Sequence, residues 1–303
     1  MNRTEGINHR YRGLDIWPDG DVLDALWEGQ RRAVDCLRPA LPAIAGAARA
    51  MAERLAQPEA RLVFAGAGSA GRLACIEGME LGPTFSFPDA RIALLLAGGE
   101  RLALGGHGGV EDDSAAGQAR MAALAPVPSD VVVAVAASGS TAFTLAVARA
   151  ARAAGALTIA IANNPETPLL AASDHPVLLD SGAEVINGST RMGAGTAEKA
   201  ALNLLTTLTM IRLGHVHDGL MVDLRVENAK LRERAVAMLM EITGCGREAA
   251  AEALARSADR VKTAALLLKG ARPDDADRLL KEAGGNLRIA LGTLATRARS
   301  GAS

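Results

Sequence analysis

Arg61-Leu-Val-Phe-Ala-Gly-Ala-Gly-Ser-Ala-Gly71 is the stretch that decides the fold of this 303-residue chain. Residues 61–65 form a short apolar run typical of a buried strand, and the glycine-rich loop 66–71 leads directly into a helix-like stretch at 69–81. A helix N-terminus offers unpaired backbone N–H groups and the positive end of a dipole, so it favours an anion. The sequence therefore predicts a strand, an anion-binding loop and a helix.

Two further loops have the same chemistry. Ala137-Ser-Gly-Ser-Thr141 follows an apolar run, and Asn187-Gly-Ser-Thr-Arg-Met-Gly-Ala-Gly-Thr196 precedes a long helical pattern. Small and hydroxyl residues let the backbone approach a ligand and add hydrogen-bond donors. One such loop is a weak signal, but three together indicate a sugar phosphate held by hydroxyls and backbone amides.

Short apolar runs alternate with helical patterns through the middle of the chain. This alternation predicts an α/β fold, with a doubly wound, mostly parallel sheet flanked by helices. Ligands of such sheets bind beyond the carboxyl ends of the strands, where the loops can meet. The expected strands are 61–65, 91–97, 130–136, 157–162 and, more weakly, 176–179, and the clearest helices between them are 69–81, 111–124 and 141–154.

Helical patterns flank this central part. We expect helices within 20–56, broken at Pro39 and Pro42, a long helix at 196–213 and another at 224–242. Beyond Gly244 the pattern predicts three short helices and a frayed end, with the helices at 246–256, 259–268 and 274–283. The predicted organisation is an N-terminal helical segment (1–58), an α/β sugar-phosphate domain (59–243) and a small C-terminal helical domain (244–303).

Composition argues against several classes of partner. The net charge is −1 and aromatic residues make up 2% of the chain, so neither a basic surface nor stacking platforms for nucleic acid are expected. No apolar run approaches the ~20 residues that span a bilayer. Three widely spaced cysteines are typical of a reducing compartment, so we expect a cytoplasmic protein that binds neither nucleic acid nor membrane.

A dinucleotide site is the main rival interpretation of the first loop. Gly66-x-Gly68-x-x-Gly71 satisfies the dinucleotide fingerprint, and Glu100 could supply the acidic residue that grips the ribose. The two hydroxyl-rich loops have no obvious role in such a site. We therefore favour the sugar phosphate.

Carboxylates lie close to the predicted loops. Glu77 and Glu80 are three residues apart on one helix and share a face, and Glu111 lies near the start of another helix. Two carboxylates from different segments could act as general acid and base across one sugar. Acidic residues in a first helical turn also complement the helix dipole, which is the expected role of Asp112 and Asp113.

Short motifs of a distinctive kind are spread in order over most of the chain. They include Gly66-Ala-Gly-Ser-Ala-Gly-Arg-Leu73, Pro83-Thr-Phe85, Glu111-Asp112, Ala136-Ala-Ser-Gly139, Gly188-Ser-Thr-Arg-Met192, Leu220-Met-Val-Asp223 and Thr243-Gly-Cys-Gly-Arg-Glu248. Together these stretches resemble the N-acetylmuramic acid 6-phosphate etherases, which belong to the sugar isomerase (SIS) superfamily. The resemblance implies an SIS-type sheet.

The resemblance also implies an activity and its residues. It predicts a carbon–oxygen lyase of peptidoglycan recycling that converts N-acetylmuramic acid 6-phosphate to N-acetylglucosamine 6-phosphate and D-lactate, without metal or cofactor, as a homodimer. By position Glu80 matches the principal acid/base and Glu111 its partner; which of them is acid and which is base stays open. The alternative is a regulatory SIS protein that senses a sugar phosphate without turnover. The expected substrate-binding residues are Gly68, Ser69, Arg72, Ser138, Gly139, Ser140, Thr141, Ser189, Thr190, Arg191 and Lys199.

The chain departs from the family pattern near the expected pocket. Ala70 stands where the family usually has a second hydroxyl, and Ser140 where it often has arginine. Residues 75–82 also replace the usual sequence of the helix that carries Glu80. These changes leave open an altered substrate preference.

Overall fold

A five-stranded parallel sheet forms the centre of the structure, a computed structural model that describes residues 2–99 and 109–300. The strand order β2-β1-β3-β4-β5 confirms the doubly wound α/β arrangement, and all five expected strands are present. Their bounds are β1 Leu62–Gly66, β2 Ile92–Leu96, β3 Val131–Val135, β4 Leu157–Ala162 and β5 His175–Leu178.

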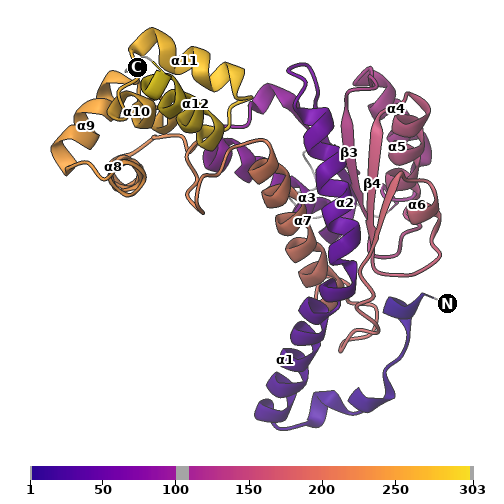
Figure 1. Cartoon of the computed structure of the whole chain (residues 1–303). Helices are drawn as coiled ribbons and strands as arrows, with labels where there is room; N and C mark the ends of the chain where they lie inside the picture. Colours follow the sequence, from indigo (N-terminus) through magenta and orange to yellow (C-terminus); the bar gives the residue numbers. More distant parts are fainter. Residues whose placement is uncertain (1, 100–108, 301–303) are drawn as a thin grey trace. The chain divides into compact units, whose positions relative to one another are not determined.

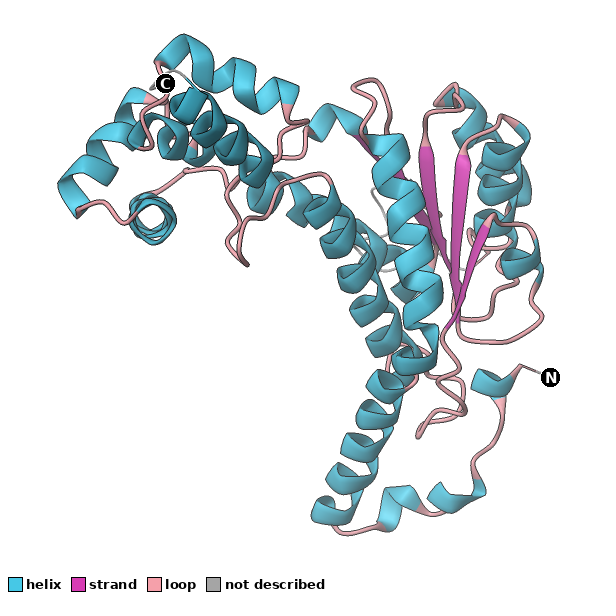
Figure 2. Cartoon of the chain, in the orientation of Figure 1, coloured by secondary structure: helices cyan, strands magenta, loops and turns pink. Residues whose placement is uncertain are grey.

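Helices cover both faces of the sheet. Every residue of β3 is buried, which explains why this strand is an unbroken apolar run rather than an alternating one. Figures 1 and 2 show α4, α5 and α6 over one face and α2 over the other. The bounds of these helices are α2 Leu37–Leu55, α4 Ser114–Ala123, α5 Ala142–Ala153 and α6 Pro168–Ala171.

Two glycines bring β1 and helix α3 (Gly68–Phe85) into close contact. A Cβ on Gly66 would lie 2.7 Å from the Cα of Gly71, and a Cβ on Gly71 would lie 2.8 Å from the carbonyl carbon of Gly66. Neither position therefore accepts a larger residue without a backbone shift. The parallel register pairs Gly66 with Val135, so the loops after β1 and β3 begin at the same edge of the sheet.

The two prolines do not break the first long helical region as predicted. The interruption falls at Cys36, between α1 (Asp19–Asp35) and α2, and both Pro39 and Pro42 lie inside α2. Pro39 occupies the first turn, where the missing N–H has no intrahelical partner in any case. Pro42 removes a single helical hydrogen bond, which the burial of the later α2 face against the sheet outweighs.

The chain divides into two compact units. The first contains residues 1–79 and 90–208, with the sheet; the second contains residues 80–89 and 209–303. Helices α3 and α7 (Gly193–Arg212) contribute residues to both units. The domain limits expected from the sequence stay a prediction.

The second unit is helical and has its own apolar core. It contains α8 Ala229–Thr243, α9 Arg247–Arg256, α10 Val261–Leu268 and α11 Pro273–Glu282, close to the expected positions. The expectation of only three short helices after Gly244 was wrong, because a fourth, α12 (Leu287–Ser300), follows Gly284-Gly285. Leu287 and Ala290 are buried in the core of this unit, which explains why this segment forms a helix.

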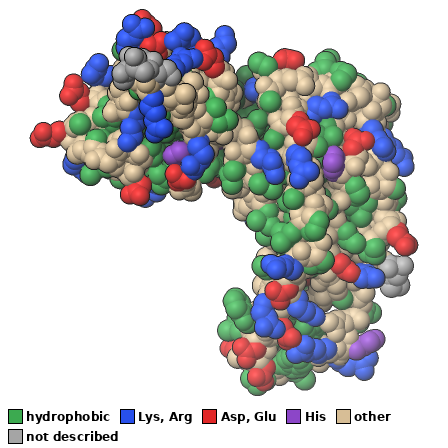
Figure 3. All heavy atoms as spheres, viewed as in Figure 1, with side chains coloured by type: hydrophobic (Ala, Val, Ile, Leu, Met, Phe, Trp, Pro, Cys, Tyr) green, Lys and Arg blue, Asp and Glu red, His purple; other side chains and the backbone are tan. Residues whose placement is uncertain are grey.

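The surface carries both signs of charge. Basic and acidic side chains are interspersed over the face shown in Figure 3. Among the described helices, none has the length and apolar character that crossing a membrane requires.

Candidate functional site

A pocket of about 310 Å³ lies at the carboxyl ends of β1 and β3. The chain passes from β1 to β2 on one side and later reaches β3 on the other, so this is the topological switch point of the sheet, where such folds bind ligands. The lining residues come from five segments of the first unit: Glu5; Ala67, Gly68, Ser69 and Ala70; Glu111 and Asp112; Ala136, Ala137, Ser138, Ser140 and Thr141; and Thr190 before α7 together with Glu198 on it.

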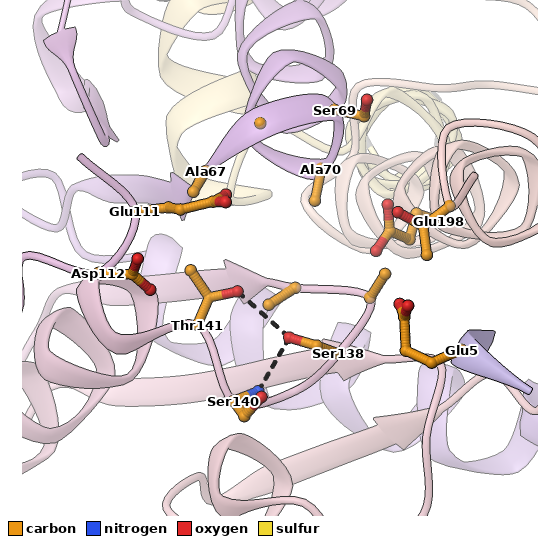
Figure 4. Close-up of a pocket in the computed structure, with 14 residues that line it drawn as sticks. Glu5, Ala67, Ser69, Ala70, Glu111, Asp112, Ser138, Ser140, Thr141 and Glu198 are labelled. Carbon is orange, nitrogen blue, oxygen red and sulfur yellow. Dashed lines mark hydrogen bonds between the residues drawn. The ribbon is translucent and has the colours of Figure 1, made fainter. Parts of the chain in front are cut away.

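The loop after β3 presents hydroxyls to the pocket in a fixed arrangement. The Ser138 Oγ lies 3.3 Å from the Thr141 Oγ1 and accepts a hydrogen bond of 3.2 Å from the Ser140 N–H (Figure 4). Gly139 has a φ of +64°, and a Cβ there would lie 2.3 Å from the Thr167 Oγ1, so this turn requires glycine. Thr141 precedes the first residue of α5, so the hydroxyls stand at a helix N-terminus.

The loop after β1 forms the facing wall. Gly68 begins α3 with a φ of +53°, and a Cβ there would lie only 3.7 Å from the Glu111 Oε2. Glu111 therefore lies close to the start of α3. Ser69 contributes a hydroxyl to the lining, whereas Ala70, at the position where a second hydroxyl was expected from the family, contributes a methyl group.

The N-terminal segment reaches the pocket through buried hydrogen bonds. The Thr4 N–H donates to the Asn164 Oδ1 (3.2 Å), and the Asn164 Nδ2 donates to the Thr4 Oγ1 and to the Ala137 carbonyl (2.9 Å each). Asn164 thus ties the segment that carries Glu5 to the loop that carries Ser138. Glu5 was not among the site residues predicted from the sequence.

Among the described residues that line the pocket, the ionisable side chains are all acids: Glu5, Glu111, Asp112 and Glu198. Figure 4 shows Glu111 and Asp112 on one side and Glu5 and Glu198 on the other. Asp112, expected only to complement a helix dipole, is exposed and also lies in the pocket lining. Asp113 does have the expected role at a helix start, because its carboxylate accepts the Ala116 N–H of α4 at 2.8 Å.

Two buried carboxyl groups adjoin the start of α7. Glu184 accepts hydrogen bonds of 2.9 Å from the N–H groups of Gly193 and Ala194, so the helix N-terminus stabilises its charge. Glu198 is only 1% exposed, and its Oε1 has no hydrogen-bond partner among the described residues. Burial, with a smaller contribution from the negative charge of Glu184, raises the pKa of Glu198 to about 8.

A third buried carboxylate, Glu77, joins α3 to α7. Its Oε2 accepts hydrogen bonds from the Asn203 Nδ2 (2.6 Å) and the Lys199 Nζ (3.2 Å), and its Oε1 accepts one from the Thr206 hydroxyl (2.5 Å). Lys199, expected to bind substrate, is thus paired with Glu77. The charge of Glu77 is compensated within the protein.

The structure brings about half of the expected site residues together. Gly68, Ser69, Glu111, Ser138, Ser140, Thr141 and Thr190 line the pocket. The described lining does not include Glu80, Arg72, Gly139, Ser189, Arg191 or Lys199. Gly139 lies between two lining residues, and Glu80 is exposed on α3 within the second unit. Glu100 of the dinucleotide alternative lies outside the described residues.

Sequence reasoning missed Glu5, Glu184 and Glu198 as part of this region. Glu198 in particular was not among the candidate site residues predicted from the sequence. The available signal was its helical position, two residues after the hydroxyl Thr196 and on the helix that the third loop opens. Burial at that position follows from the tertiary contacts of α7, which the sequence pattern alone did not show.

Comparison with known families identifies the domains. The SIS domain matches residues 110–208, and the glucokinase regulatory protein N-terminal SIS domain matches residues 44–151. The C-terminal lid domain of glucokinase regulatory protein matches residues 218–269. The expected SIS-type fold is confirmed.

Curated relatives are similar over nearly the whole chain. N-acetylmuramic acid 6-phosphate etherase of Deinococcus radiodurans is 46% identical over 291 residues, covering 96% of this chain and 95% of the relative. The protein of the same name from Cutibacterium acnes is 39% identical over 289 residues, covering 95% of each chain. A solved structure of a candidate phosphosugar isomerase involved in capsule formation, from Bacteroides fragilis, superposes with a TM-score of 0.51 at 21% identity and covers 67% of this chain and 95% of that one. That likeness shows the fold alone.

Proposed function

The chain belongs to the N-acetylmuramic acid 6-phosphate etherase family, and we propose that the pocket at the carboxyl ends of β1 and β3 is where it cleaves this substrate. The enzyme breaks the ether between the sugar and its D-lactyl group, giving N-acetylglucosamine 6-phosphate and D-lactate. In the cell this reaction serves the recycling of peptidoglycan.

The convergence of two helix N-termini with a set of hydroxyls is the observation that carries the proposed site. The starts of α3 and α5 both reach the pocket, together with Ser69, Ser138 and Thr141. Backbone N–H groups and hydroxyls at such ends suit a phosphate. A sugar anchored there by its phosphate places its carbon chain beside the pocket carboxylates.

Two glutamates carry the chemistry in this proposal. On the ring-opened sugar a base removes the acidic proton beside the aldehyde carbon, an acid protonates the departing ether oxygen, and water then adds to the double bond. Glu111 lies in the pocket lining, within reach of such a substrate. Glu80, the proposed principal acid/base, is supported by its match to the family motif before Pro83-Thr-Phe85.

The remaining binding residues and the assembly are part of the same proposal. Arg72, Ser189, Arg191 and Lys199 are supported by their family positions, and we propose a cytoplasmic homodimer. The exposed apolar side chains of α1, Leu23 and Trp27, support an interface between copies, because they are 64% and 69% exposed. The cytoplasm is consistent with free thiols at the three cysteines.

The direct test is release of D-lactate from N-acetylmuramic acid 6-phosphate, followed with a D-lactate dehydrogenase. We expect Glu111→Gln and Glu80→Gln each to lower kcat by about 10²- to 10⁴-fold, the range for loss of a general acid or base. Glu53→Gln, at an exposed position on α2, is the matched control and should retain full activity. Absence of lactate with folded wild-type protein would refute the proposed site and the activity.

The same assay tests the regulatory alternative, which the two matches to glucokinase regulatory protein keep relevant. A sensor would bind the sugar phosphate without releasing lactate. Calorimetric binding measured beside the lactate assay separates the two functions.

A further inference from the structure

Glu198 is a buried carboxyl group in the pocket wall that the proposed chemistry does not use. It is 1% exposed, it lines the pocket from α7, and its Oε1 lacks a hydrogen-bond partner among the described residues. Leaving a buried polar atom unpaired costs about 1–3 kcal/mol. Because this atom belongs to a group in the lining of a cavity, a bound ligand can supply the missing partner.

The surrounding charges favour the neutral form of this carboxyl group. Glu184, whose carboxylate accepts hydrogen bonds from the N–H groups of Gly193 and Ala194, lies nearby on the loop before α7. Glu5, Glu111 and Asp112 are the other acids that line the cavity.

The nearest cation along the helix is already engaged. The Lys199 ammonium group contacts Glu77 and the Asn203 Oδ1. With burial and Glu184 together raising its pKa to about 8, Glu198 holds its proton near neutral pH.

We propose that Glu198 binds the substrate as a protonated carboxylic acid, donating its O–H to an oxygen of the sugar phosphate. This inference rests on the proposed function. An ionised carboxylate here would repel an anionic substrate, whereas a neutral acid provides a donor that requires no positive charge. It thus adds a pH-dependent hydrogen bond to those of the hydroxyl loops.

Binding of the product N-acetylglucosamine 6-phosphate, measured by calorimetry between about pH 6.5 and about pH 9, tests this role. For the wild type we expect Kd to weaken about tenfold towards pH 9, where only about a tenth of Glu198 stays protonated. Glu198→Gln keeps a donor of similar shape, so we expect it to bind within about threefold of the wild type at low pH and to lose the pH dependence. Glu198→Leu should bind about tenfold more weakly at about pH 6.5.

The ratio of the Kd values of the wild type and Glu198→Gln at each pH isolates the effect of Glu198. The phosphate of the ligand ionises in the same way in both measurements, so its effect cancels. Glu184→Gln is the second control. It removes the negative neighbour of Glu198 and so lowers the pKa of Glu198, and we therefore expect this variant to lose affinity for the product at a lower pH than the wild type does. Thermal melting of each variant shows that it is folded.

Parallel pH profiles for the wild type and Glu198→Gln, or unweakened binding by folded Glu198→Leu, would overturn the inference. If lactate is still released in either case, only the role of Glu198 fails. If the wild type neither binds the product nor releases lactate, the proposed function fails and the inference with it.

Discussion

Two buried glutamates, Glu77 on α3 and Glu198 on α7, show opposite ways to accommodate a carboxyl group inside a protein. Glu77 is 3% exposed and accepts hydrogen bonds from Lys199, Asn203 and Thr206. Glu198 is 1% exposed, has an unpaired oxygen and lies near a second carboxylate. Burial is therefore nearly equal, but the supply of donors is not.

The difference assigns different tasks to the two groups. A carboxylate with three donors is compensated in the free protein and contributes to holding α3 against α7. A buried carboxyl group without donors destabilises the folded protein when it ionises. Such a group is accommodated when it is protonated or when a ligand supplies its hydrogen-bond partner. Stability is expected to depend on the first and ligand binding on the second.

Removal of the Glu77 carboxylate should give the largest loss of stability. We expect Glu77→Ala to lower the free energy of unfolding by about 3 kcal/mol, because it leaves a cavity, deprives the Asn203 amide of its acceptor and leaves the Thr206 hydroxyl with the Leu202 carbonyl in place of the carboxylate. Urea denaturation at neutral pH measures the change.

Paired glutamine variants provide the control for that loss. Glu77→Gln turns an amide NH₂ towards donors and should cost about 2 kcal/mol. Glu198→Gln should not destabilise the protein at pH 7 and should make it more stable than the wild type, because wild-type Glu198 must take up a proton on folding at that pH. Equal losses at both positions would show that the two carboxyl groups are not accommodated differently.

The second prediction is that ionisation of Glu198 makes the stability of the protein depend on pH. The folded protein keeps this proton up to about pH 8, whereas the unfolded chain releases it near the ordinary value of 4.5. The contribution of protonated Glu198 to the free energy of unfolding is therefore fully present below about pH 4.5 and is lost as the pH rises to about 8. Relative to Glu198→Gln, wild-type stability should fall with a slope of up to about 1.4 kcal/mol per pH unit within this window.

Urea denaturation at several pH values between about 5 and 9 gives both curves. Other titrating groups are common to the two proteins and cancel in the difference. Curves that stay parallel would mean that Glu198 ionises normally in the folded protein.

Local patterns in the sequence were sufficient to predict the sheet and the glycine loops. The strands are continuous apolar runs because both faces of the sheet are covered, and Gly66 and Gly71 mark a contact that only glycine permits. These features depend on residues close together in the chain. The predicted breaks at Pro39 and Pro42 were wrong. Pro39 lies in the first turn of α2, and the contacts of α2 with the sheet outweigh the hydrogen bond that Pro42 removes.

The pocket could be predicted only where its residues follow strands. Ser69 and Ser138 each lie three residues after the end of a strand, β1 and β3, so the loop pattern found them. Glu5 and Glu198 are nearly two hundred residues apart and reach the pocket through long-range contacts, such as the bonds of Thr4 to Asn164. Their residue type was visible in the sequence, but the distant residues that bring them to the pocket were not.

Lys199→Met gives the smallest expected effect and tests how the Glu77 cluster shares its charge. The Lys199 side chain is 37% exposed, and its ammonium group lies 3.2 Å from the Glu77 Oε2, so solvent weakens the ion pair. Asn203 and Thr206 still donate to Glu77 in the variant, and the methionine chain retains the apolar contacts of the lysine stem. We therefore expect a loss of only about 0.5–1 kcal/mol, which should shrink further in about 1 M salt. A loss in urea denaturation as large as that of Glu77→Ala would mean that the lysine charge, not the neutral donors, stabilises the buried carboxylate.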